Sequence, residues 1–424
     1  MRFTAFYCGL GTVTLLILAG AGGGGMFAQG YKPTLAADHP AIAYPQSPAH
    51  NVIEKLIAQL ERGGAPLESR GGTFGYLPSL LDRLGLNADS QLLVFSKTSF
   101  QAPQIGPDNP RAIYFNDQVA VAYVPGSASL ELMAVDPVQG PMFYVMSPGT
   151  SARPRLARGG VCLQCHQGPQ TAGVPGPYVG SVIPGPSGAP LRDVSAVITD
   201  HRSPFIERWG GWYVTARRGD NYARANALAL NPAQPASLVR ESPRNLVTLV
   251  GRFSLANYLA PTSDIVALMT FEHQTQMTNL ITRVGWQARM SRQAGGRDEA
   301  IARALDADIA ALSDYMLFGG EAPLESPVEG VSSFTRSFAQ RGPRDSRGRS
   351  LRDFDLQTRL FRYPVSYMIY SEAFDGLPAD VRSRIYRRLH EALTSTAQAG
   401  GHVSARAARA TLEILSETKP EMRP

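Results

Sequence analysis

The spacing of hydrophobic positions changes near residue 90. Before it, apolar residues recur with helical spacing over residues 51–62, which end at Gly63-Gly64, and over 78–84. After it come short runs of β-branched and aromatic residues separated by Pro, Gly, Asn and Asp, the pattern of β-strands. These runs cover residues 92–95, 112–115, 119–124, 130–135, 142–146, 178–183 and 212–215. We therefore expect a β-rich region over residues 91–217, preceded by an N-terminal arm and two helices over 31–90.

A second change near residue 263 marks the start of a helical region. Residues 218–262 are mixed and rich in proline, which predicts a linker. From residue 263 to 424, apolar positions follow a helical period, interrupted by glycine pairs and by a charged loop at 341–350. The helices are expected at residues 263–292, 298–318, 359–371, 378–394 and 404–418. The predicted fold class is α+β: an N-terminal mixed or antiparallel β region followed by a helical C-terminal region.

The first 30 residues have the pattern of an export signal. Arg2 is followed by an uncharged stretch up to Tyr31, whose apolar core ends in small residues. Cleavage is expected after Ala21 or Ala28. The alternative is an uncleaved N-terminal anchor, because the stretch could span a bilayer, but its run of four glycines makes a poor membrane helix. Either outcome places the rest of the chain outside the cytoplasm, in the periplasm.

The composition narrows the classes of partner. The chain of 424 residues contains 41 glycines and 32 prolines, which implies many loops, and carries a net charge of +6. A basic surface could bind an acidic redox partner protein, although a surplus of arginine also follows from genome composition. Without lysine-rich runs or interleaved aromatic residues, we expect no nucleic-acid partner. A membrane contact is expected only through an uncleaved N-terminal segment.

The segment Cys162-Leu163-Gln164-Cys165-His166 has the Cys-x-x-Cys-His spacing of covalent haem attachment. Two thiols at this spacing can each add to a vinyl group of the porphyrin, and the adjacent imidazole can ligate the iron as proximal ligand. The only other cysteine, Cys8, lies in the predicted signal segment, so no disulfide framework competes for these thiols. The predicted cofactor is one haem c, attached in a loop of the β-rich region.

Two other kinds of site use paired cysteines. A structural zinc site would need four nitrogen or sulfur ligands, and none of the other six histidines forms a second pair at close spacing. A redox-active dithiol is the stronger alternative, but it usually begins a helix after a buried strand. Here glycines precede the motif, and Gly168-Pro169 follows it.

The sixth ligand of the iron decides the function, and the sequence leaves it open. His273 lies on the apolar stripe of helix 263–292, with Met277 one turn away, and His201 follows an aspartate that could orient its ring. An open sixth position is a further alternative. The alternative is that these residues do not bind iron and have a purely structural role, as a buried histidine and an ordinary core methionine. Arg158 and Arg202 could bind the haem propionates, or they could be surface arginines.

Several segments together resemble a family of large, exported, single-haem cytochromes c. They are CLQCH at 162–166, NPRAIYFND at 109–117, SPFIERWGGWYV at 203–214, FEHQTQMTNLITR at 271–283 and SYMIYSEAFDGLP at 366–378. The resemblance implies that Cys162 and Cys165 carry the thioether bonds and that His166 is the proximal ligand. Small cytochromes c are about a quarter of this length, and dihaem peroxidases carry two such motifs where this chain has one.

Two functions follow from these expectations. The first is an exported c-type cytochrome that transfers electrons, with a side chain as the sixth ligand. The alternative is a haem enzyme, such as a peroxidase-like oxidoreductase, or a haem-based gas or redox sensor, in which the sixth position is open or displaceable.

Overall fold

The computed structural model describes residues 32–149, 154–192, 194, 196–219, 224–231, 238–240, 246–295, 297–395 and 405–422. Residues 1–32 and 33–424 form two compact units, and the description below concerns the second. The predicted signal segment and Cys8 lie outside the described residues. Among the described helices, none is both long enough and apolar enough to cross a membrane.

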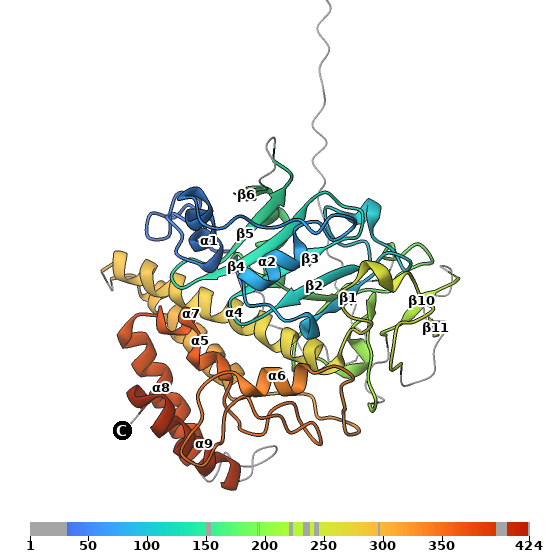
Figure 1. The fold of residues 1–424 in the computed structure, drawn as a ribbon. Coiled ribbons are helices and arrows are strands. Elements are labelled where there is room, and N and C mark those ends of the chain that lie inside the picture. Colours follow the sequence, from blue (N-terminus) through green and yellow to red (C-terminus); the bar gives the residue numbers. More distant parts are fainter. Residues whose placement is uncertain are drawn as a thin grey trace, which may run out of the picture. The chain divides into compact units, whose positions relative to one another are not determined.

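A seven-stranded antiparallel sheet is the centre of the N-terminal half (Figure 1). Its strand order is β6-β5-β4-β3-β2-β1-β9, so most neighbours in the sheet are also neighbours in the chain. The strands are β1 (Leu92–Val94), β2 (Arg111–Phe115), β3 (Val119–Tyr123), β4 (Leu130–Asp136), β5 (Gly140–Ser147), β6 (Arg155–Arg158) and β9 (Trp212–Tyr213). The expected antiparallel β region is confirmed, and β6 is a strand that the pattern did not predict.

One face of the sheet packs against the N-terminal helices α1 (Val52–Glu61) and α2 (Leu77–Arg83). Asn51 caps α1, since its side chain accepts hydrogen bonds from the backbone of Ile53 and Glu54. The alternate residues Val119, Val121 and Tyr123 of β3 face this layer, as the period of a strand requires.

The 29-residue helix α4 (Ile265–Gln293) packs against β5 and against α5 (Glu299–Met316) and α6 (Phe334–Gln340). Because α4 has the sheet on one side and helices on the other (Figure 1), most of its polar side chains are buried as well. Thr270, Thr278 and Thr282 satisfy their buried hydroxyls by donating to the carbonyls four residues earlier.

Most of the predicted C-terminal helices are confirmed as α5, α8 (Ala379–Thr394) and α9 (Ala405–Thr418). The helix predicted over residues 359–371 is wrong: the structure has a bridge between Phe354 and Phe361 and only a short 3₁₀ turn at Tyr367–Tyr370. Pro364 explains the difference, because it lacks an amide proton and disfavours helical geometry at the residue before it.

The described parts of the predicted linker pack on the body of the protein. Within it, β10 (Ala227–Ala229) pairs with β11 (Leu238–Arg240). Tyr258 is buried in the same hydrophobic cluster as the sheet, and its hydroxyl donates to the Pro110 carbonyl at 2.8 Å.

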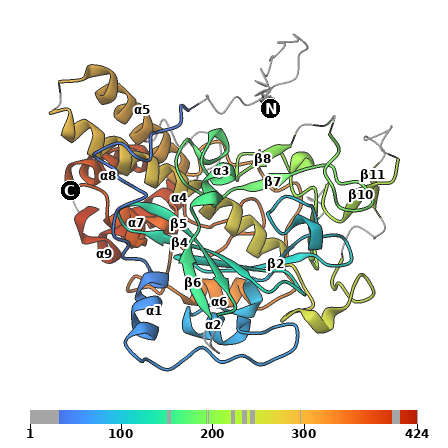
Figure 2. The same ribbon diagram turned by 90° about the horizontal axis from the view of Figure 1, so that it is seen from above.

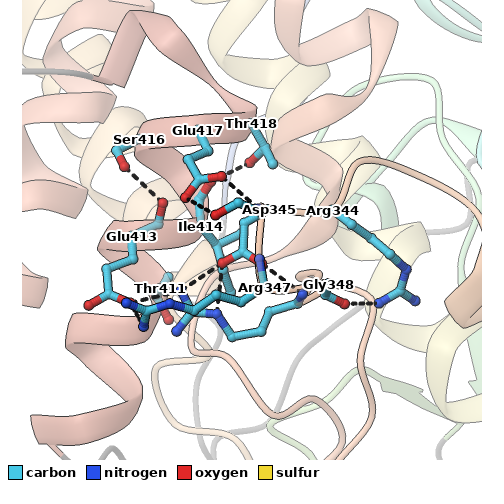
Figure 3. A network of polar contacts seen from close by, with 12 residues as sticks. Arg344, Asp345, Arg347, Gly348, Thr411, Glu413, Ile414, Ser416, Glu417 and Thr418 are labelled. Carbon is cyan, nitrogen blue, oxygen red and sulfur yellow. Dashed lines mark hydrogen bonds and ion pairs between the residues drawn. The ribbon is translucent and has the colours of Figure 1, made fainter.

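The charged loop at 341–350 is tied to α9 by exposed ion pairs. Arg347 Nη1 lies 2.9 Å from Glu413 Oε2 (Figure 3), and Arg349 reaches the same carboxylate at 2.7 Å. Because Arg347 and Glu413 are largely exposed, their pair stabilises the fold by at most about 1 kcal/mol.

Candidate functional site

The Cys-x-x-Cys-His motif lies between β6 and β7 (Val179–Ser181), in a 3₁₀ turn at Gly160–Cys162 followed by the short helix α3 (Leu163–His166). The Gly159 amide donates to the Phe143 carbonyl of β5 at 2.9 Å, which fixes the start of this turn on the sheet. A Cβ atom at Gly159 would lie 2.9 Å from Cys162 Sγ, so glycine leaves room for the sulfur. Cys162 is half-buried, Cys165 is exposed, and neither forms a disulfide.

All three predicted haem-attachment residues, Cys162, Cys165 and His166, line one cavity of about 760 Å³. This is within the range of roughly 300–1,000 Å³ that ligand pockets span. The cavity lies against the face of the sheet opposite α1 and α2. Its other walls include α3 and the pair formed by β7 and β8 (Val197–Thr199), which lie near one another in Figure 2.

Small side chains on β3 leave this space open. Ala120 and Ala122 face the cavity, whereas the larger alternate residues of β3 face the opposite core. Glu131 and Met133 line the cavity from β4, Phe143 does so from β5, and Phe271 is the contribution of α4. The lining is therefore mostly apolar with a few polar groups, as is usual for a site that binds an organic ligand.

His166 is held in one orientation and in one tautomer. Its Nδ1 lies 3.0 Å from the Gly176 carbonyl oxygen, which can only accept, so Nδ1 carries the proton and Nε2 keeps a free electron pair. The Gly176 amide donates back to the His166 carbonyl at 2.8 Å. Phe143 and Tyr178 flank the ring, at centroid distances of 4.6 and 5.4 Å. Burial lowers the pKa of His166, which favours the neutral form that ligates metals.

Asn279 of α4 holds the loop that orients His166. Its Nδ2 donates to the Pro177 carbonyl at 2.8 Å, next to the residue that orients His166. A Cβ atom at Gly176 would lie only 1.9 Å from Asn279 Oδ1. Residue 176 must therefore be glycine for the loop and α4 to approach this closely.

We expect Gly176→Ala to lower the free energy of unfolding by about 1–3 kcal/mol, because the new methyl group displaces Asn279 from Pro177 and leaves buried polar groups unpaired. Urea unfolding followed by circular dichroism measures the change. Gly160→Ala is the matched control, since a Cβ atom there meets nothing within 4 Å. If Gly176→Ala costs as much in an Asn279→Ala background as in the wild type, the clash is not the cause.

The pKa of Cys162 differs from that of a redox-active thiol. Burial, together with the nearby Glu131 carboxylate, raises its pKa. Redox-active cysteines have a lowered pKa and sit in electropositive surroundings. In this respect Cys162 is unlike a redox-active thiol.

Two cations line the cavity, and the sequence did not single out either of them. Arg111 of β2 forms an ion pair with Glu131 at 3.2 Å, while its buried Nε has no hydrogen-bond partner in the described part of the chain. Lys97 lines the cavity from the loop after β1. The sequence pattern could have identified Arg111, because it lies two residues before Ile113 on β2. Residues two apart on a strand have their side chains on the same face.

The arginines predicted to bind propionates lie elsewhere. Arg158 of β6 donates to the carbonyls of Tyr44 and Ser47, at 3.0 and 3.1 Å. Arg202 forms an ion pair with Asp200 at 2.6 Å and covers the Tyr315 ring. Neither is among the residues that line the cavity.

The structure brings the two histidines proposed as sixth ligands together, but away from the cavity lining. His201 Nδ1 and His273 Nδ1 are 2.8 Å apart, and His273 Nε2 lies 2.7 Å from Ser366 Oγ. Both rings are buried, and burial lowers the pKa of each well below its usual value. Met277 is fully buried in the core around α4 and does not line the cavity either. Sequence spacing identified an inward-facing helix surface, but His273 and Phe271 leave α4 in different directions and only Phe271 reaches the cavity.

Among the described residues, no group of three or more His, Cys, Asp or Glu side chains could hold a metal ion. Haem iron needs no such group, because the porphyrin supplies four of its ligands. No known protein-family model matches the chain, and comparison with curated proteins and with solved structures finds no similar protein.

Proposed function

We propose that the chain is an exported c-type cytochrome that holds one haem covalently in the cavity beside α3 and transfers electrons. The observation that carries this proposal is the joint position of Cys162, Cys165 and His166 in the wall of a single large cavity. Their spacing in the sequence requires only that they be close in the chain, not that they border a space large enough for an organic cofactor.

The residues present fit a haem in three respects. The thiols of Cys162 and Cys165 are free to add across the two vinyl groups, each forming a carbon–sulfur bond with the thiol hydrogen passing to the second vinyl carbon. His166 offers Nε2 while Gly176 holds its other nitrogen, the arrangement that fixes the ring of a ligating histidine. Arg111, whose buried Nε has no partner among the described residues, offers a donor to an anionic group such as a propionate.

A bound haem would supply an iron that alternates between the ferrous and ferric states. The chain contributes the rest of the function: it orients the imidazole, keeps most of the cavity apolar and attaches the cofactor at the surface, where Cys165 is exposed. An exposed attachment site suits electron exchange with a redox partner protein. Export to the periplasm through residues 1–30 belongs to the same proposal, because haem attachment to such proteins takes place outside the cytoplasm.

Denaturing electrophoresis followed by haem staining tests the proposal on the full-length protein purified from a host that attaches haem c. We expect the stain to remain with the polypeptide, since thioether bonds survive unfolding. A folded protein that loses all haem on denaturation, or never contains it, would contradict covalent attachment and return the dithiol to consideration.

A further inference from the structure

We propose that Met133, on β4, supplies the sixth ligand of the haem iron. The inference rests on the proposed covalent haem and adds the residue that determines whether the iron is open. It differs from the candidates His273, Met277 and His201, because Met133 is among the residues that line the cavity and these three are not.

The attachment residues restrict where the iron can lie. Cys162, Cys165 and His166 all border the same cavity, so the iron of an attached haem lies within it, and a sixth ligand must come from its lining. Protein side chains that ligate haem iron are His, Cys, Met and Tyr. Apart from the motif itself, the described lining offers three of these: Met133, Tyr144 and Tyr178.

The two tyrosines are poorly suited to ligation. The Tyr144 hydroxyl accepts from Asn51 Nδ2 at 2.8 Å and donates to Glu54 at 3.0 Å, so it points into the layer around α1. The Tyr178 ring packs beside the His166 ring, on the side of the proximal ligand.

Lys97 also lines the cavity and carries a nitrogen. It lies in the loop after β1 and is only partly buried. An ammonium must lose its proton before it can ligate iron, whereas a thioether ligates as it stands.

Met133 lines the cavity from β4. It is 9% exposed, and its Cα partners across the sheet are Ala120 of β3 and Phe143 of β5. Phe143, whose ring contacts His166, lies directly across from Met133, so both side chains leave the same face of the sheet and line the cavity. The small side chain of Ala120 leaves space beside the thioether. Methionine has three rotatable side-chain bonds, which allow its sulfur to turn toward an iron in that space.

Absorption spectroscopy of the haem-loaded Met133→Leu variant tests the assignment. Leucine keeps the volume and apolar character of the side chain but removes the sulfur. We expect the ferric variant to lose the weak long-wavelength charge-transfer band of sulfur–iron ligation, and the ferrous variant to gain carbon monoxide binding that the wild type lacks. We also expect the midpoint potential to fall, since methionine ligation raises it.

Met277→Leu is the matched control, because that methionine is fully buried but lies outside the cavity lining. Its spectra and carbon monoxide binding should equal those of the wild type. A Met133→Leu protein with covalent haem and unchanged spectra would overturn the assignment while leaving the proposed cytochrome intact. Ready carbon monoxide binding by the wild type would also overturn it and would favour a ligand-binding haem protein. Absence of covalent haem from the wild type would overturn both proposals.

Discussion

Replacement of both Cys162 and Cys165 by serine is expected to abolish covalent haem attachment. A serine hydroxyl is a far weaker nucleophile than a thiol toward the vinyl groups, so neither thioether can form. The double variant should give no haem stain after denaturing electrophoresis and should accumulate less, because a cavity of about 760 Å³ then lacks its tethered occupant.

The two single variants test the attachment points one at a time. Cys162→Ser and Cys165→Ser should retain a weaker haem stain, since one thioether remains. Cys8→Ser is the matched control: it removes the only other cysteine and should leave the stain unchanged. Equal staining of the wild type and of the double variant would disprove the central role of the motif.

The largest loss of stability is expected for Arg208→Ala, which breaks a buried ion pair. Arg208 Nη1 lies 3.0 Å from Glu272 Oε2, and the two side chains are 2% and 0% exposed. Arg208 also donates to the carbonyls of Ser203 and His201, and Glu272 accepts from the Thr199 hydroxyl of β8 at 2.6 Å. Burial raises the pKa of Glu272 to about 7, against the opposing influence of Arg208. Glu272 therefore joins α4 both to Arg208 and, through Thr199, to β8, a wall of the cavity.

Removal of Arg208 leaves Glu272 buried without its counter-charge. Loss of one partner of a buried pair typically costs about 3–5 kcal/mol, and we expect the free energy of unfolding to fall by that amount in urea titrations. Arg347→Ala is the control, because Arg347 pairs with Glu413 (Figure 3) at an exposed site, and Arg349 still reaches that carboxylate. A change within about 0.5 kcal/mol is expected there. Similar losses in both variants would show that burial does not set the strength of the Arg208 pair.

Local sequence patterns predicted the secondary structure where the signal was itself local. The short runs of β-branched and aromatic residues became β1 to β5, and Asn51 and Pro378 immediately precede α1 and α8. The same reasoning missed β6, whose residues are largely exposed and have no apolar alternation. It also placed a helix across Pro364, where apolar spacing outweighed a residue that cannot continue a helix.

For the candidate site, the sequence determined the motif and its chemistry, because the spacing of two thiols and an imidazole is a property of five consecutive residues. Only the tertiary structure decided which distant residues join them. Met133, Arg111 and Phe143 come from three different strands, and their meeting depends on strand order and register, which no local period encodes. The same holds for His201 and His273: each has a recognisable local setting, but only packing of α4 against the residues after β8 places their rings against each other and outside the cavity lining.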